Sequence, residues 1–166
     1  NPFLFVYREE EGLDRFLIAE CETMGVQMPI LVGLAAPTRG QADTVVQGLN
    51  ITQIDDSQPI IIFNIDTFRP GYRLPEHFDL ARIDGYLEVF RGSGPNWSYV
   101  RPMDADDCRA AETSEKIEIS DLCCTGLYYF REISRFQAAF EMQAGDNEIG
   151  ELFVAPLYND LISAGA

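Results

Sequence analysis

Residues 59–68 constrain the fold of this chain more than any other stretch. The apolar run at 60–63 is too short for a helix and is typical of a strand buried on both faces, as in a parallel sheet covered by helices. Asn64 and Asp66 follow it, and open α/β sheets bind ligands just beyond the carboxyl ends of their central strands. We therefore expect Asp66 to hold a divalent metal over substrate phosphates, whereas the alternative is that both residues only cap a turn.

Strands and helices alternate along the early part of the chain. Strands are predicted at residues 3–7, 29–34 and 60–63, and amphipathic helices at residues 13–24 and 42–49. Helices that join parallel strands form right-handed crossovers, which favour a doubly wound sheet. We therefore predict an α/β fold, with one domain over residues 1–166 that has a Rossmann-like, mixed but mainly parallel sheet and helices on both faces.

The later part of the chain is rich in strand-forming residues that are separated by turns. Strands are predicted at residues 85–90, 97–101, 109–112 and 122–130, the last interrupted at 125–126, and helices at residues 77–81, 131–144 and after Pro156. His77, the only histidine, is interpreted as a surface or capping residue and not as a catalytic base.

The charge of the chain excludes some classes of partner. The 166 residues have a formal net charge of −15, so we expect neither nucleic acid nor an anionic membrane surface as a partner. A substrate that carries phosphate would need a metal or clustered cations to bind. We find neither a signal-peptide pattern nor an apolar run near the roughly 18 residues of a membrane span. We therefore expect a cytoplasmic protein, and the sequence also allows a homo-oligomer.

Three further places could carry chemistry. Lys116 is the only lysine, and its compact charge suits a phosphate, or only a surface ion pair with Glu115. The loop at 38–42 stands at a helix entrance, where it could contact an anion or a base, or only cap the helix. Glu151 precedes the last helix, where it could accept hydrogen bonds from sugar hydroxyls or only favour the positive end of that helix.

Four stretches taken together resemble a known family. They are residues 38–42 (TRGQA), 64–66 (NID), 115–128 (from EK to TGLY) and 150–152 (GEL). Their order and spacing resemble those of the sugar-phosphate nucleotidyltransferases, the nucleotide-sugar pyrophosphorylases such as the glucose-1-phosphate thymidylyltransferase group, over nearly the whole chain. Residues 97–98 (WS) and 154–158 (VAPLY) are most similar to the branch linked to capsule and surface polysaccharide synthesis.

The resemblance implies an activity and a set of site residues. In this family a sugar 1-phosphate attacks the α-phosphorus of a nucleoside triphosphate, giving a nucleotide sugar and pyrophosphate, while Mg²⁺ and basic residues stabilise the charge. The resemblance implies Asp66 as a catalytic metal ligand and Lys116 as a catalytic residue near the sugar phosphate. It implies substrate contacts by Arg39, by Gln41 to the nucleobase, by Glu115 and Glu151 to sugar hydroxyls, and by Ser98, Cys124 and Gly126 in the sugar pocket.

The sequence also departs from the family pattern. These residues contain neither the Gly-rich loop with Arg and Lys that clamps the triphosphate nor the strand that follows the last helix. Ile65 and Ser98 stand where the family commonly has glycine, and a bulky Ile65 could hinder the approach of the backbone to the nucleotide. We therefore expect the chain by itself to be inactive. Two alternatives stay open, a glycosyltransferase that uses a nucleotide sugar and a non-catalytic domain that binds sugar nucleotides.

Overall fold

A computed structural model describes residues 2–76, 79–146 and 150–165, which form two compact units. Unit 1 comprises residues 1–54 together with 150–152, and unit 2 comprises residues 55–149 and 153–166. His77 lies outside the described residues. None of the helices in the described ranges has the length and apolar character that crossing a bilayer requires.

Unit 1 has the alternating strands and helices that the sequence predicts. Its elements are β1 (Leu4–Arg8), α1 (Leu13–Met24), β2 (Ile30–Leu34) and α2 (Gln41–Thr52). β1 and β2 pair in parallel, with Leu4 opposite Ile30, and α2 packs against both strands. Gly25 ends α1 in the left-handed conformation, as its place after an apolar stripe predicts. The local pattern of apolar residues is therefore a sufficient guide to this unit.

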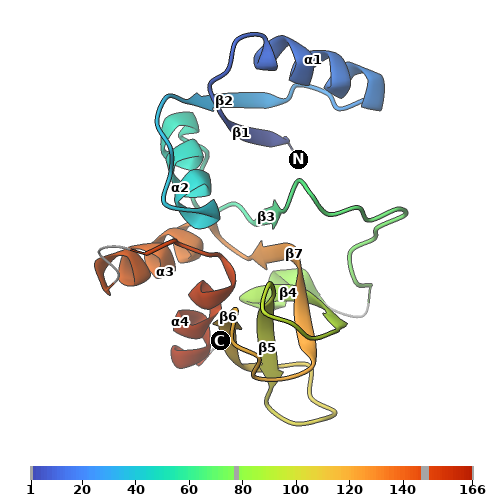
Figure 1. Cartoon of the computed structure of the whole chain (residues 1–166), viewed down its shortest axis with the longest axis vertical. Coiled ribbons are helices and arrows are strands. Elements are labelled where there is room, and N and C mark those ends of the chain that lie inside the picture. The colour runs from blue at the N-terminus through green and yellow to red at the C-terminus, as the bar shows by residue number, and fades with distance from the viewer. Residues whose placement is uncertain (1, 77–78, 147–149, 166) are drawn as a thin grey trace. The chain divides into compact units, whose positions relative to one another are not determined.

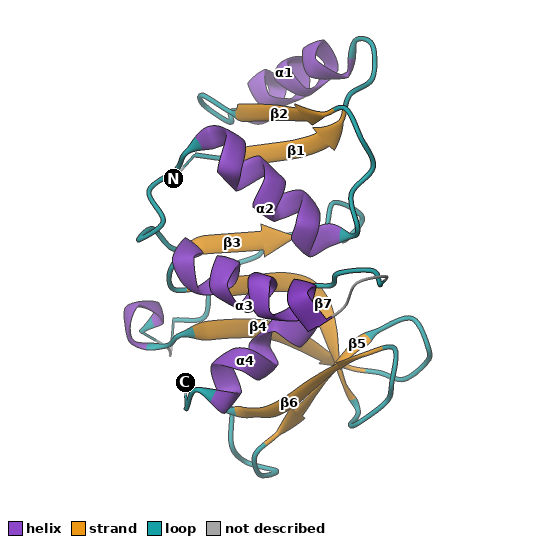
Figure 2. Cartoon of the chain, turned by 90° about the vertical axis from the view of Figure 1, so that its left-hand side faces the viewer, coloured by secondary structure: helices purple, strands orange, loops and turns teal. Residues whose placement is uncertain are grey.

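Unit 2 is built around a five-stranded sheet (Figure 1). Its strands are β3 (Ile60–Phe63), β4 (Gly85–Arg91), β5 (Ser98–Pro102), β6 (Ala110–Glu115) and β7 (Leu122–Phe130). The order is β3-β7-β5-β6, and β4 also pairs with β7. The helices are the short 3-10 turns η1 (Leu80–Arg82) and η2 (Ala155–Leu157) and the α-helices α3 (Ile133–Asp146) and α4 (Tyr158–Ser163). Both α-helices lie against one face of the sheet (Figure 2).

The strand directions differ from the prediction of a mainly parallel sheet. β1 and β2 are parallel, but every strand pairing described in unit 2 is antiparallel. Short turns join several of these strands, and short connections favour antiparallel neighbours over parallel ones. The described residues therefore form a mixed α/β fold, and the Rossmann-like doubly wound sheet stays a prediction.

β3 is not buried on both faces, and that part of the prediction is wrong. Ile62 is 5% exposed, whereas Ile61 and Phe63 on either side of it are 45% and 43% exposed. Side chains of a strand point alternately to its two faces, and only one face of β3 packs against the core. The run of apolar residues is therefore a strand with one covered face.

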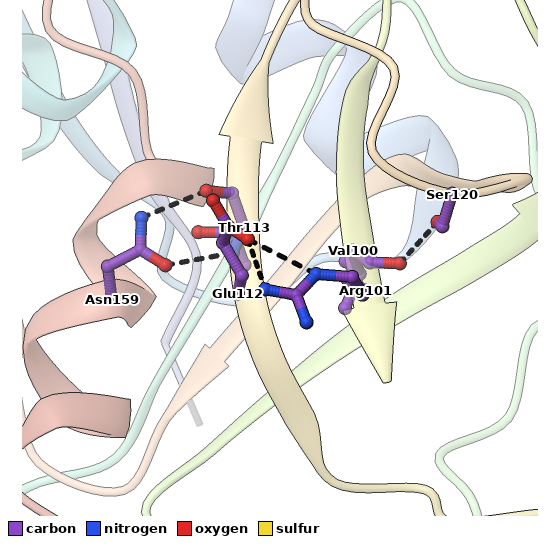
Figure 3. Close-up of polar contacts among 6 residues, drawn as sticks. All are labelled: Val100, Arg101, Glu112, Thr113, Ser120 and Asn159. Atoms are coloured by element: carbon purple, nitrogen blue, oxygen red, sulfur yellow. Dashed lines mark hydrogen bonds and ion pairs between the residues drawn. The ribbon is translucent and has the colours of Figure 1, made fainter. Parts of the chain in front are cut away.

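A buried polar network fastens α4 to β6 (Figure 3). The backbone N–H of Thr113 donates to Asn159 Oδ1 at 2.8 Å, and Asn159 Nδ2 donates back to the Thr113 carbonyl at 2.9 Å. Thr113 Oγ1 donates to the Ala155 carbonyl at 2.7 Å, and Thr113 itself is 2% exposed. β6 extends beyond its predicted end at residue 112 and reaches Glu115, where it still pairs with Ser98 of β5.

Candidate functional site

The end of β3 meets an irregular part of β7. Along β4, Leu87 lies opposite Tyr128 but Val89 lies opposite Cys124, so the register shifts at Glu88, where residues 125–127 of β7 bulge out. Gly126 in this bulge has a φ of +91°, and a Cβ there would lie 2.6 Å from Asn64 Cγ. The Asn64 N–H donates to the Gly126 carbonyl at 3.0 Å. Glycine at 126 therefore lets β3 end directly against β7, and bulges of this kind re-aim nearby side chains.

The loop that carries Asp66 is folded against this bulge. The Thr67 N–H donates to the Asn64 carbonyl at 3.3 Å, and Thr67 Oγ1 donates to the Thr125 carbonyl at 3.2 Å. Asp66 lies between Asn64 and Thr67 in the sequence and is exposed, as is Ile65. The turn therefore presents a single carboxylate just beyond the carboxyl end of β3.

The donor set at Asp66 suits magnesium that is carried by a substrate. Among the residues that the structure describes, no three His, Cys, Asp or Glu side chains come together as a metal site. Mg²⁺ commonly binds through one or two carboxylates and completes its shell with water and phosphate oxygens. One exposed carboxylate therefore fits a magnesium ion that arrives with a nucleotide, and it does not fit a metal held by protein ligands alone.

Ser98, Glu115 and Cys124 come together on β5, β6 and β7. Ser98 lies opposite Glu115 in the sheet, and its hydroxyl donates to Glu115 Oε2. Burial, with the nearby charge of Glu115 acting in the same direction, raises the pKa of the Cys124 thiol to about 12. Two of the predicted substrate-binding residues, Ser98 and Cys124, therefore lie near the carboxylate of a third, Glu115.

Tyr128 belongs to the same cluster, although the sequence analysis gives it no role. Burial raises the pKa of its phenol, the nearby Cys124 and Glu115 act in the same direction, and a hydrogen bond with Ser98 opposes them. The signal that could have found Tyr128 is its position two residues after Gly126, because alternate residues of a strand share a face. The cluster therefore consists of one carboxylate with hydroxyl and thiol groups around it.

Lys116 directly follows β6, and does not begin a new strand. Its backbone is left-handed, with a φ of +61°, and its N–H donates to the Trp97 carbonyl at 2.9 Å. The Lys116 Nζ lies 4.5 Å from the centre of the Phe153 ring, a distance typical of a cation–π contact. An aromatic face therefore accompanies the only ammonium side chain of the protein.

Unit 1 brings the other predicted site residues together through the backbone. The Leu152 N–H donates to the Arg39 carbonyl at 2.6 Å, and the Ala42 N–H donates to the Leu152 carbonyl at 3.1 Å. Gly40 between them has a φ of +124°, and a Cβ there would lie 2.6 Å from the Leu152 oxygen and 2.9 Å from Glu151 Cγ. Glu151 therefore lies beside the loop that leads from Arg39 to Gln41.

The entrance of α2 is capped in a way that the sequence did not indicate. The N-cap residue, Gly40, has no side chain to cap the helix, and the Leu152 carbonyl accepts from the first turn in its place. The Arg39 N–H donates to Asp43 Oδ2 at 2.7 Å, and Thr44 Oγ1 donates to the Gly40 carbonyl at 3.0 Å. Two backbone N–H groups at this entrance are therefore already paired within unit 1, which limits what the loop can offer to an anion.

One hollow in unit 1 lies away from the predicted site residues. An open hollow of about 710 Å³ in unit 1 is lined by parts of α1 and β2 and by the turn between them, including Cys21, Met28 and Leu31. It contains none of the predicted site residues. The candidate residues therefore form separate groups, with six predicted residues in unit 2 and with Arg39, Gln41 and Glu151 in unit 1.

The chain is similar to a protein of known structure. No family model matches it, and no curated protein matches it. The crystal structure of a nucleoside-diphosphate-sugar pyrophosphorylase from Vibrio cholerae RC9 has 39% sequence identity to this chain and a TM-score of 0.89. The match covers 99% of this chain and 70% of the Vibrio chain. Sequence and fold therefore agree on one relationship along almost the entire chain.

Proposed function

The chain belongs to the family of nucleoside-diphosphate-sugar pyrophosphorylases, and from this we propose that the protein transfers a nucleotidyl group from a nucleoside triphosphate to a sugar 1-phosphate. A phosphate oxygen of the sugar phosphate forms a bond to the α-phosphorus while the bond to the β-phosphate oxygen breaks. The products are a nucleotide sugar and pyrophosphate. The observation that carries the proposal is the likeness to the Vibrio pyrophosphorylase in both sequence and fold. We further propose a cytoplasmic role in surface polysaccharide synthesis.

Both substrates are anions, whereas the protein has a net charge of −15, so local cations must offset the repulsion. Lys116 supplies one cation toward the sugar phosphate, and the Phe153 face restricts the positions that its ammonium group can take. Asp66 would hold Mg²⁺. When bound with the nucleotide, that ion would neutralise charge on the phosphates. Asp66 at the β3 turn and Lys116 after β6 are accordingly the residues to which we assign catalysis.

The cluster around Glu115 is suited to sugar hydroxyls. A carboxylate accepts hydrogen bonds from hydroxyl groups, and the Ser98 hydroxyl fixes one of the Glu115 oxygens in place. Cys124 and Tyr128 are both neutral near pH 7, and burial raises the pKa of each still further from it, so neither adds negative charge beside Glu115. We assign this cluster, together with Gly126, to the sugar.

We assign Arg39, Gln41 and Glu151 of unit 1 to substrate binding as well, with the Gln41 amide contacting the nucleobase. An amide offers both a donor and an acceptor, which a base edge can pair with. Glu151 is held beside this loop by the Leu152 backbone contacts, and we assign it to sugar hydroxyls.

The test is a pyrophosphate-release assay of the full-length protein with Mg²⁺, each common nucleoside triphosphate and a panel of sugar 1-phosphates. We expect release that requires both substrates. A nucleotide sugar supplied with pyrophosphate should be broken down to nucleoside triphosphate. Transfer of its sugar to an acceptor would instead support a glycosyltransferase, and binding by calorimetry without turnover would support a non-catalytic domain. We expect no turnover from the 166 residues alone, because they contain no Gly-rich loop to clamp the triphosphate.

A further inference from the structure

Glu88 lies on β4 opposite the bulge of β7. Its side chain is only 14% exposed, although it carries a charge. One oxygen, Oε2, accepts a hydrogen bond of 2.7 Å from Thr125 Oγ1, and the other, Oε1, forms an ion pair with Arg69. A single carboxylate therefore connects the bulge to the loop that follows β3.

The same loop is already held to the bulge at its beginning. Asn64 and Thr67 both donate to carbonyls of residues 125 and 126. Arg69 comes two residues after Thr67, and its guanidinium also lies over the Tyr72 ring, 5.8 Å from the ring centre. Asp66 therefore lies in a short segment that is anchored on one side by backbone and hydroxyl contacts and on the other by the ion pair of Arg69 with Glu88.

We propose that Glu88 is a positioning residue, which fixes the loop of Asp66 by bridging Arg69 and Thr125. Its catalytic consequence rests on the function proposed above, whereas the anchoring itself does not. The Glu88 side chain is 14% exposed and the Arg69 side chain is 39% exposed, so the ion pair is partly covered. Removing one partner of a covered ion pair costs more than removing one partner of an exposed pair, because it leaves the other charge poorly solvated and unpaired.

The sheet offers a matched control. Arg101 and Glu112 also form an ion pair of Arg with Glu, but their side chains are 51% and 44% exposed, and they join β5 to β6, which are already paired (Figure 3). Neither residue belongs to a candidate site. Glu112→Gln therefore removes an equivalent charge without releasing a loop.

The experiment compares Glu88→Gln with Glu112→Gln in the full-length protein. Hydrogen–deuterium exchange of residues 65–70 should become faster in Glu88→Gln and stay unchanged in Glu112→Gln. In the pyrophosphate assay, Glu88→Gln should lower kcat by roughly tenfold or more, because small displacements of positioned groups are costly, while KM for the sugar 1-phosphate changes by about twofold or less. Arg69→Gln should reproduce both effects, and the double variant should be no worse than either single variant.

Unchanged exchange of residues 65–70 in both Glu88→Gln and Arg69→Gln would overturn the proposal. Faster exchange with an unchanged kcat would overturn the catalytic part and leave the proposed function standing. If the unsubstituted protein shows no turnover with any substrate pair, the proposed function fails, and the exchange data still decide the anchoring. Should Glu88→Gln fail to fold, Arg69→Gln is measured by the same criteria, because Arg69 is the more exposed partner.

Discussion

The two units hold their candidate residues in different ways. In unit 1, Arg39, Gln41 and Glu151 are brought together by backbone hydrogen bonds between the Gly40 loop and Leu152. In unit 2, side-chain hydrogen bonds contribute as well, from Thr67 Oγ1 to the Thr125 carbonyl and from the Ser98 hydroxyl to Glu115. Similar substitutions in the two units should therefore have different consequences, because a side chain can rotate away and a paired backbone cannot.

Gly40→Ala should give the largest loss of stability. The backbone of Gly40, with φ of +124° and ψ of −176°, is in a region that is essentially restricted to glycine, and the new Cβ would meet the Leu152 carbonyl. We expect a loss of roughly 3 kcal/mol in the free energy of unfolding, measured by urea denaturation. Glu151→Ala should not restore it, because the closest obstacle is backbone.

Gly12→Ala is the control for unit 1, since Gly12 has a φ of +83° and nothing lies within 4 Å of its added Cβ. It should cost about 1 kcal/mol from conformation alone. Equal losses for Gly12→Ala and Gly40→Ala would contradict the claim that the contact with Leu152 decides the result.

Gly126→Ala should lower the free energy of unfolding by less than Gly40→Ala does, and a second substitution at Asn64 should restore part of the loss. An added Cβ would lie 2.6 Å from Asn64 Cγ, and the alanine would also have to adopt a φ of +91°. We expect a loss of about 2 kcal/mol, of which roughly half returns in the double variant with Asn64→Ala. Gly94→Ala, with a φ of +118° and open space around its Cβ, serves as the control. If the double variant recovers none of the lost stability, the proposed distinction between the two units is contradicted.

Thr113→Val should separate a buried hydrogen bond in unit 2 from an exposed one in unit 1. It leaves the Ala155 carbonyl without its 2.7 Å donor in the interior, and we expect a loss of about 1–2 kcal/mol by thermal unfolding. Thr23 also donates to a carbonyl, that of Ala19, but on an exposed face of α1. Thr23→Val should change stability by less than about 0.5 kcal/mol, and an equal effect at both positions would count against this interpretation.

Ionisation of the buried Cys124 thiol should have the smallest effect on stability among these predictions. Burial raises the pKa of Cys124 from 9.0 to about 12, so the stability that its neutral form contributes is present below about pH 9 and is lost as the pH rises toward 12. At pH 8, iodoacetamide should alkylate the exposed Cys108 at least about a hundredfold faster than Cys124 or the buried Cys21. Mass spectrometry of peptides would measure the rates, and equal rates would show that unit 2 opens readily around Cys124.

Local patterns in the sequence predicted unit 1 better than unit 2. The helical stripe that ends at Gly25 and the strand at residues 30–34 depend on neighbours along the chain, and both are confirmed. β3 pairs with β7 in the antiparallel direction, with Ile60 opposite Phe130. These partners lie more than 60 residues apart, so a local sequence pattern contains no information on their pairing. The sequence therefore predicts the strands of unit 2, whereas their antiparallel pairing differs from the mainly parallel sheet that it favours.

The candidate site shows the same division. The sequence marked residues 125–126 as an interruption, and the structure gives the reason in the left-handed Gly126 and its contact with Asn64. Glu88 was not singled out, because its partners Arg69 and Thr125 lie 19 and 37 residues away. Roles for Asp66 and Lys116 were inferred from the residues as well as from the resemblance, and they stay predictions.

The most direct test of the proposed function compares Asp66→Ala with Asp106→Ala in the full-length protein. Both carboxylates are exposed residues of unit 2, but only Asp66 lies in the turn after β3. Pyrophosphate release in the presence of Mg²⁺, a nucleoside triphosphate and a sugar 1-phosphate should fall at least about a hundredfold in Asp66→Ala and stay near the original rate in Asp106→Ala. Thermal unfolding should be unchanged in both. Release at the original rate by Asp66→Ala would contradict the assignment of Asp66 to catalysis.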